Sequence, residues 1–400
     1  MAVDDLWYLA KRAADGQRIP SKRHGRGKRW RVRWVDDRGA ERAQLFERKS
    51  DAERHDANVH ADLSRGQYID DRAGRITLAE WAGEWRSSQL HNDSTTIRVE
   101  HAVRLHIVPQ LGGQQIGRIR HSHIQGWVKD RAGELAPSTI RVVFGYLNAM
   151  MSAAVRDRRI AANPCVDVRL PDLDGSPRFI PSPAQIHRIA DLLPVRLAPM
   201  VYIAAGCGLR LGEVLGLEAG DVDFGAQELH VRRQLKVLKG RTPFLGPVKT
   251  KTSVRTVELP KLVWNALDAH LQDGVDPVDI DDDTDPRRPT RRPAHLLFRG
   301  ASGDPINAAT FSRTWATARI PVGLPDRWGF HGLRHYFATL LIHAGASVKT
   351  VQLALGHSTP TVTLNTYAHE WPDVLDRTRS LVDEALGTRE TAAIPAERRT

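Results

Sequence analysis

Four side chains that can handle a phosphate group lie within 37 positions of one another: His331, Arg334, His357 and Tyr367. A guanidinium can bind two phosphate oxygens at once, and the free N–H groups of a helix N-terminus attract anions. A tyrosine hydroxyl becomes a nucleophile when neighbouring groups activate it. Each residue alone is more commonly a packing or surface side chain, but the combination is harder to dismiss, because it brings together four groups able to handle a phosphate.

A helix is expected to carry the first two of these groups. Residues 331–342 hold apolar side chains at helical spacing, so His331 and Arg334 fall on the first turn. Those apolar residues are Leu333, Phe337, Leu340 and Leu341.

The segment between this helix and the tyrosine is expected to be broken twice. Gly345 fits a helix end, and residues 349–355 predict a short second helix. Pro360 and the β-branched residues 361–363 are expected to interrupt the chain again before Tyr367.

A third cation lies upstream, in a glycine-rich and apolar segment, residues 206–217. Arg210 is a candidate phosphate clamp, because an unpaired arginine among buried leucines would be costly. Glu213, three residues later, is the alternative partner in a simple ion pair.

Two further cations that could act as a general acid lie in the segment that follows. Residues 227–231 predict one strand, and residues 247–260 predict a hairpin. Lys249 and Lys251 are two residues apart, so on an unbroken strand both side chains face the same way. Periodicity therefore cannot choose between these two lysines.

These residues resemble the tyrosine recombinase (phage integrase) family. Its second signature block, H-x-x-R, then L-G-H, then Y-x-H, is matched by His331 and Arg334, by residues 355–357, and by residues 367–369. Its first block contains an arginine that Arg210 matches. The family pattern P-K-T-x-x-S-x-R-T-x-x-L-P, with Val248 in place of the usual proline, selects Lys249 and leaves Lys251 as the alternate.

The resemblance implies a role for each residue. Tyr367 would attack the scissile phosphorus and form a 3′-phosphotyrosyl bond, while Lys249 would protonate the departing 5′ oxygen. Arg210, with Glu213 as its support, and Arg334 would bind the non-bridging oxygens. His331 would manage the proton of Tyr367, and His357 would donate a hydrogen bond to the phosphate.

No cofactor and no metal are expected. The phosphotyrosyl bond would conserve the energy of the cut strand, and the sequence contains no GxxxxGK[ST] phosphate-binding loop. His331 and His335 have a spacing that suits zinc, but Arg334 lies beside them and no HExxH motif is present.

Composition indicates a folded protein that prefers a polyanion. The net charge is +11 with 41% hydrophobic residues, although charge alone does not separate nucleic acid from an anionic membrane. Cys165 and Cys207 give no disulfide framework. The start of the chain shows no targeting signal, and no apolar run approaches the ~20 residues of a membrane span. We therefore expect a cytoplasmic, nucleoid-associated bacterial protein without a membrane partner.

A basic segment opens the chain. Residues 22–33 contain seven Lys or Arg and no acid, and from Trp30 apolar and basic residues alternate as in a half-buried strand. A partner strand at 42–47 and a helix from Ser50 or Asp51 to about Leu63 complete a small module. From charge alone a solvated face is as plausible as DNA contact, but the layout resembles the arm-type DNA-binding domain of some phage integrases. The candidate DNA contacts are Lys22, Arg23, Arg26, Lys28, Arg29, Arg31 and Arg33.

The next hundred residues are helical, with four expected helices between 77 and 171 that resemble the family's core-binding domain. Ser138 is expected to cap the fourth, and Asn163-Pro164 to end it. Ser182 with Pro183 opens the following helix.

Two further segments carry predictions. Residues 273–293, with seven Asp between 273 and 285 and then Pro-Arg repeats, are expected to form a mobile surface loop, and a metal site there is unfavoured. Residues 371–386 predict a final amphipathic helix, which in the family docks on a neighbouring subunit. Here it could equally fold back on its own domain.

The expected fold is mainly α with small β-sheets (α+β). Its parts are an arm-type module (1–75), a helical core-binding domain (76–174), a mixed α/β catalytic domain (175–387) and a polar tail (388–400). The resemblance implies a site-specific DNA recombinase, an integrase of a phage or integrative element, because a chromosome-dimer resolvase does not need the first module. Its partners would be double-stranded attachment sites, three further copies in a homotetramer on synapsed DNA, and an accessory excision or bending factor. The alternatives are a type IB topoisomerase, which shares the chemistry but needs no synapsis, and a catalytically silent DNA-binding relative.

Overall fold

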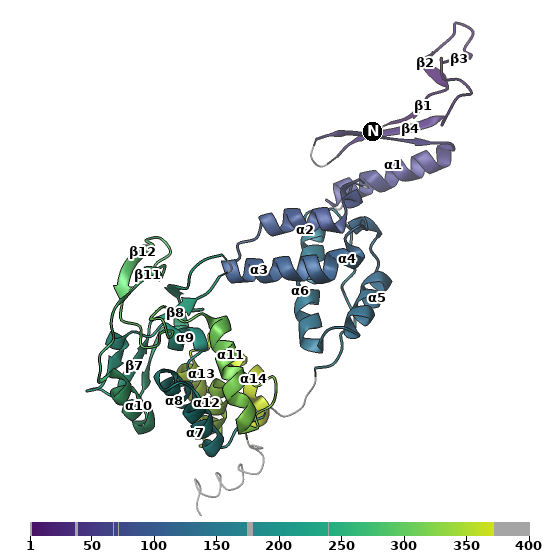
Figure 1. The fold of residues 1–400 in the computed structure, drawn as a ribbon. Helices are drawn as coiled ribbons and strands as arrows, with labels where there is room; N and C mark the ends of the chain where they lie inside the picture. Colours follow the sequence, from purple (N-terminus) through teal and green to yellow (C-terminus); the bar gives the residue numbers. More distant parts are fainter. Residues whose placement is uncertain are drawn as a thin grey trace, which may run out of the picture. The chain divides into compact units, whose positions relative to one another are not determined.

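The computed structural model describes residues 2–36, 39–66, 68–70, 72–173, 179–238 and 240–371. The chain divides into two compact units, Met1–Ser176 and Pro177–Thr400. It is mainly helical with small sheets, as predicted (Figure 1). The division into three domains stays a prediction. The expected final helix, apart from Trp371, and the tail lie outside the described residues.

The first sheet of the N-terminal unit forms around the predicted alternating strand. Its strands, in the order β1-β4-β5, are β1 (Ala2–Asp5), β4 (Trp30–Val35) and β5 (Glu41–Phe46), and a separate ribbon pairs β2 (Tyr8–Arg12) with β3 (Arg18–Pro20). Val32 and Trp34 are buried, as the alternation required. Strands β1 to β3 were not expected, because they are short and mostly polar. Helix α1 (Lys49–Ser64) begins after Arg48, so the predicted caps Ser50 and Asp51 were wrong.

The helical part of this unit packs around one apolar cluster that contains Trp81, Trp127 and Met150. Its elements are α2 (Leu78–Ser87), α3 (Asp93–Ala102), a π-helical turn η2 (Val103–Ile107), α4 (Val108–Leu111), α5 (His121–Ala132) and α6 (Pro137–Arg156). Helix α6 starts with Pro137 at its first position and ends at Arg156. The predicted cap at Ser138 and the predicted end at Asn163-Pro164 were therefore wrong. Proline at the first helical position lacks only an N–H that the helix leaves unpaired.

The C-terminal unit is built around α8, whose side chains are almost all buried. Its main helices are α7 (Pro183–Leu192), α8 (Ala198–Cys207), α9 (Leu211–Leu215), α10 (Lys261–Leu271), α11 (Ala308–Arg319), α12 (His331–His343), α13 (Val348–Leu355) and α14 (Pro360–Tyr367). Ser182 caps α7, as predicted. Leu340 on α12 is half exposed, although its spacing predicted burial. Pro360 starts helix α14 instead of breaking the chain, which corrects the prediction and makes Tyr367 a helical residue.

Two small sheets complete the unit. One has the order β10-β7-β6 and the other β12-β11-β9-β8. Their bounds are β6 (Val222–Asp223), β7 (Glu228–Val231), β8 (Arg233–Lys236), β9 (Phe244–Pro247), β10 (Arg255–Glu258), β11 (Val278–Asp282) and β12 (Thr290–Ala294). Residues 247–260 are not the predicted hairpin, because β9 pairs with β8 and β10 pairs with β7. Lys249 and Lys251 therefore lie in the connection between two sheets.

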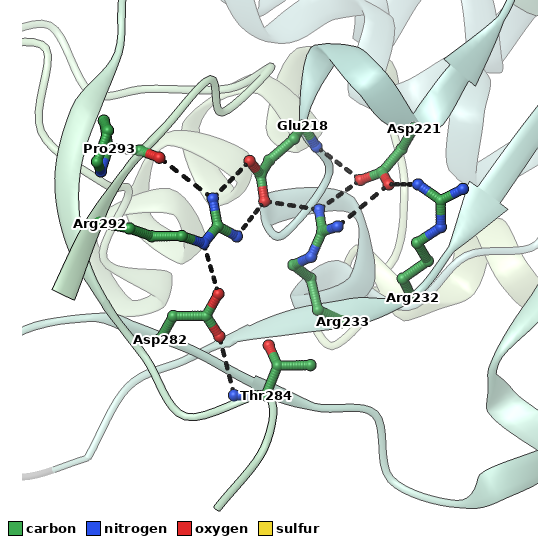
Figure 2. A network of polar contacts seen from close by, with 8 residues as sticks. All are labelled: Glu218, Asp221, Arg232, Arg233, Asp282, Thr284, Arg292 and Pro293. Atoms are coloured by element: carbon green, nitrogen blue, oxygen red, sulfur yellow. Dashed lines mark hydrogen bonds and ion pairs between the residues drawn. The ribbon is translucent and has the colours of Figure 1, made fainter. Parts of the chain in front are cut away.

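The acidic segment 273–293 is not the loop that its composition predicted. Residues 278–282 and 290–294 pair as the antiparallel strands β11 and β12, and Ile280 is buried. The hairpin has few apolar side chains, and ion pairs with other parts of the unit hold it in place. Figure 2 shows Arg292 between Asp282, at 2.7 Å, and Glu218, at 2.7 and 2.9 Å.

The same network continues into β8. Arg233 contacts Glu218 and Asp221, each at 2.7 Å, and Arg232 contacts Asp221 at 3.1 Å (Figure 2). Burial raises the pKa of Glu218, but its ion pairs with Arg292 and Arg233 outweigh burial and hold that pKa below its usual value. The network thus ties the sheet that contains this hairpin and β9, the strand before Lys249, to the segment after α9 that carries Glu218 and Asp221.

Candidate active site

Arg334 is the most deeply buried cation of the site. Its side chain is 1% exposed and donates to the carbonyl of Gly208 at 2.6 Å and to that of Leu355 at 2.7 Å. These carbonyls lie at the C-terminal ends of α8 and α13, where the helix dipoles favour a cation. Burial and the nearby charge of Arg210 lower the pKa of Arg334 to about 9, so it stays protonated at neutral pH.

The turn before Arg210 brings α8 and α12 close together. Gly208 has a φ of 67°, and a Cβ there would lie 2.4 Å from the Phe337 ring. Only glycine fits both the left-handed conformation and this close approach.

Glu213 holds two arginines in place. Arg210 donates through Nη1 to Glu213 Oε1 at 2.6 Å and through its backbone N–H to Oε2 at 3.0 Å. Arg255 donates to the same Oε2 at 3.1 Å. Burial raises the pKa of Glu213, but Arg255 and Arg210 outweigh it and hold that pKa below its usual value. The predicted pairing of Arg210 with Glu213 is present in the structure.

Arg255 was not predicted as a site residue. Its side chain is 6% exposed, and besides Glu213 it donates to the carbonyls of Ala354 and Ser253, each at 3.0 Å. It thereby joins the arginine cluster to the end of α13. Strand periodicity gave no sign of this role, because Arg255 lies at the very start of β10, but the arginine of the family pattern quoted above falls at this position.

His357 is held neutral. It follows the left-handed Gly356 at the end of α13, and its Nδ1 lies 2.9 Å from the hydroxyl of Thr363. Burial, followed by the charges of Arg334 and Arg210, lowers the pKa of His357 to about 4. If Thr363 donates to Nδ1, the single imidazole proton resides on Nε2, which then can donate to a phosphate.

Tyr367 ends α14 and is 2% exposed. Its ring packs in a cluster with Phe337, Ile342 and Leu355. Its hydroxyl lies 2.7 Å from Nδ1 of His335. A charged Tyr367 would raise the pKa of Arg334, so the nucleophile and the arginines belong to one electrostatic unit.

His335 is thus a residue that sequence reasoning missed, having treated it only as a possible zinc ligand. Its ring centroid lies 4.8 Å from that of the exposed His331, one helical turn earlier. One sequence feature could have indicated His335: it lies four residues after His331, and therefore on the same face of the predicted helix. The role of His331 in moving the tyrosine proton stays a prediction.

The two candidate general acids, Lys249 and Lys251, have exposed side chains. The loop that carries them packs on Gly356, where a Cβ would lie 3.0 Å from the carbonyl oxygen of Thr252. Ser253 also contacts the Gly356 carbonyl, at 3.5 Å. The choice between Lys249 and Lys251 stays open.

The basic N-terminal candidates fall into two groups. Arg29 pairs with Asp5 at 2.8 Å, and Arg31 and Arg33 each pair with Asp4 at 2.9 Å. Strand β1, which the sequence did not predict, supplies both carboxylates. The other candidates are exposed in the loop between β3 and β4: Lys22, Arg23, Arg26 and Lys28. DNA contact by all seven stays a prediction.

Two further properties concern only the described residues. None of their helices is both long and apolar enough to cross a membrane. Among the same residues, no group of three or more His, Cys, Asp or Glu side chains is arranged to hold a metal ion.

Comparison with known proteins adds an independent observation. A model of the phage integrase family matches residues 183–372. A XerC-like tyrosine recombinase of Caldanaerobacter subterraneus subsp. tengcongensis is 30% identical over 328 residues, covering 74% of this chain and 80% of that protein. The integrase of Mycobacterium phage FRAT1 is 27% identical, covering 72% of this chain and 82% of that protein. A fragment of the Tn1549 transposon integrase, in complex with transposon right end DNA, is 25% identical with a TM-score of 0.67, covering 78% of this chain and 100% of that one.

Proposed function

The chain belongs to the phage integrase family of tyrosine recombinases, and on that premise we propose that it cuts and rejoins double-stranded DNA through a 3′-phosphotyrosyl intermediate. It is a tyrosine-type site-specific recombinase. One observation supports the proposed mechanism: Arg334 donates to the carbonyl of Leu355, against which Tyr367 packs. The charge of Arg334 also acts on Arg210, His357 and Tyr367. Such a site supplies a nucleophile and the positive groups that phosphodiester cleavage without metal requires.

The arginines bind the two non-bridging oxygens of the scissile phosphate. Arg334 is fixed by two carbonyls, and Arg210 is fixed by Glu213 through its side chain and its backbone N–H. Because these donors are already oriented, they stabilise the charge that develops on phosphorus without reorganisation. Losing one such donor costs about 10²–10³ in rate.

The protons then balance as follows. The oxygen of Tyr367 bonds to phosphorus and loses its proton to a histidine of α12, while the bond from phosphorus to the 5′ oxygen breaks and this oxygen leaves with a proton from Lys249. His357, neutral at working pH, donates a hydrogen bond to the phosphate. Religation reverses these steps on a different 5′ end and needs no nucleotide cofactor.

The number of strands to be cut gives the number of protein copies in the recombining complex. Exchange between two duplexes cuts four strands, and each chain offers one Tyr367, so four copies act on two synapsed attachment sites. The basic N-terminal loop is proposed as a further DNA contact, and an accessory excision or bending factor as a partner. An integrase of a phage or another mobile element, acting at the nucleoid, fits these properties. A type IB topoisomerase would relax DNA without joining two sites, which a two-substrate exchange assay distinguishes.

A nicked attachment-site duplex tests the chemistry. The probe is taken from the DNA that flanks the gene, and products are separated by denaturing electrophoresis. The native chain is expected to form a covalent protein–DNA adduct, and Tyr367→Phe none. An adduct that persists in Tyr367→Phe would refute the proposal, as would a native protein that binds the site but never forms one.

A further inference from the structure

We infer that His335 is an additional catalytic residue, which accepts the proton of the Tyr367 hydroxyl as this oxygen attacks DNA. The inference rests on the proposed function and deepens it. It starts from the contact that the structure gives the nucleophile: Nδ1 of His335 lies 2.7 Å from Tyr367 Oη. A general base must lie within hydrogen-bond distance of the proton that it removes, and this one does so before any DNA is present.

Burial makes a protein base necessary. The Tyr367 side chain is 2% exposed and packs against apolar residues of α12 and α13, so water has little access to it. A free tyrosine hydroxyl is also a weak nucleophile at neutral pH. The proton therefore requires an acceptor of the protein, and imidazole is the side chain best suited to this task.

Helix α12 places this acceptor beside the phosphate clamp. Arg334 and His335 are consecutive, so their side chains leave the helix in directions about 100° apart. One reaches the carbonyls of Gly208 and Leu355, and the other reaches the tyrosine. A single rigid element thus positions the group that binds the electrophile and the group that activates the nucleophile.

Nearby cations favour loss of the tyrosine proton. His335 and Arg327 line the same open hollow of about 490 Å³, together with His331. Arg334 immediately precedes His335 on the helix. These positive charges stabilise a phenolate, so the proton of Tyr367 is easier to remove. In the step itself the O–H bond of Tyr367 breaks and its proton moves to Nδ1 of His335. The tyrosine oxygen forms a bond to phosphorus as the bond from phosphorus to the 5′ oxygen breaks.

Two variants distinguish proton transfer to His335 from a hydrogen bond that only holds the Tyr367 hydroxyl in place. His335→Asn retains an acceptor atom close to the position of Nδ1 but cannot take up a proton, whereas His335→Ala removes both functions. We expect both to bind the nicked duplex with native affinity and to form the adduct about 10²-fold more slowly. His343→Asn, on the same helix and largely exposed, is the matched control and should cleave at the native rate.

Fluorinated tyrosine at position 367 supplies a readout that a structural role would not affect. Its hydroxyl is more acidic and depends less on a base, so the rate loss of His335→Asn should shrink when the two changes are combined. A rate loss of the same size with either tyrosine would overturn the inference. So would native or faster cleavage by His335→Asn, because the histidine would then only hold or restrain the hydroxyl. A failure of the native chain to form any adduct would instead refute the proposed function.

Discussion

Replacing Glu213 with glutamine tests whether one buried carboxylate holds the phosphate-binding cluster together. The carboxylate accepts three hydrogen bonds, two from Arg210 and one from Arg255, at 2.6 to 3.1 Å. Glutamine keeps one oxygen but turns an NH2 group toward a guanidinium, so one donor faces another. Arg210, Arg255 and Arg334 then remain close together without a negative charge among them.

The size of the effect follows from burial. The side chains of Glu213 and Arg255 are 2% and 6% exposed, and breaking a buried pair of this kind costs about 3–5 kcal/mol. The free energy of unfolding should fall by this amount in denaturant titrations, and adduct formation should slow by about 10² or more as Arg210 loses its support. Asp326→Asn is the control in the same unit, because its carboxylate is fully exposed and such a surface ion pair adds little to stability.

The pH dependence has a defined sign. Arg255 and Arg210 hold the pKa of Glu213 below its usual value, against the effect of burial, so its stabilisation is present at neutral pH. That stabilisation is lost as the pH falls through the lowered pKa. The stability difference between the native chain and Glu213→Gln should therefore narrow in acid. Equal stability and equal cleavage at neutral pH would refute the role assigned to this carboxylate.

Three other changes follow from the same contacts. Lys249→Ala should slow cleavage of an ordinary duplex about 10²-fold. It should not slow cleavage of a duplex with a bridging 5′ sulfur, because the sulfur leaves without a proton. If only Lys251→Ala shows this behaviour, Lys251 is the general acid. Thr363→Val removes the hydrogen bond to His357 Nδ1 and should slow adduct formation about tenfold, with unchanged DNA affinity in a gel-shift assay; an unchanged rate would separate Thr363 from the site. Arg292→Met leaves Glu218 and Asp282 without their shared partner. It should lower the free energy of unfolding by about 2 kcal/mol, a value between those for exposed and for buried ion pairs. A thermal melt identical to that of the native chain would contradict this role.

The predictable part of the molecule is the part governed by local pattern. Alternation identified β4, and the Ser182 cap with proline after it identified the start of α7. The acidic hairpin escaped prediction because local composition argued for disorder, while its partners are distant: Arg292 reaches Glu218, 74 positions away. Counting carboxylates cannot reveal which of them meet an arginine from another strand.

For the candidate active site as well, the sequence motifs predicted the residues but not the contacts that they make. Motif spacing predicted Arg210, Arg334, His357 and Tyr367 as site residues, but it could not show which groups hold each of them in place. Pro360 was expected to break the chain, yet it begins the helix that ends in Tyr367, and that helix brings the hydroxyl to His335. His331 and His335 were open to a metal interpretation from sequence alone, because the spacing of residues on one helix cannot show which side chains approach it from another helix. The identity of the base for Tyr367 is therefore a property of how α14 packs on α12, and only a change at His335 or Tyr367 that spares this packing can test it.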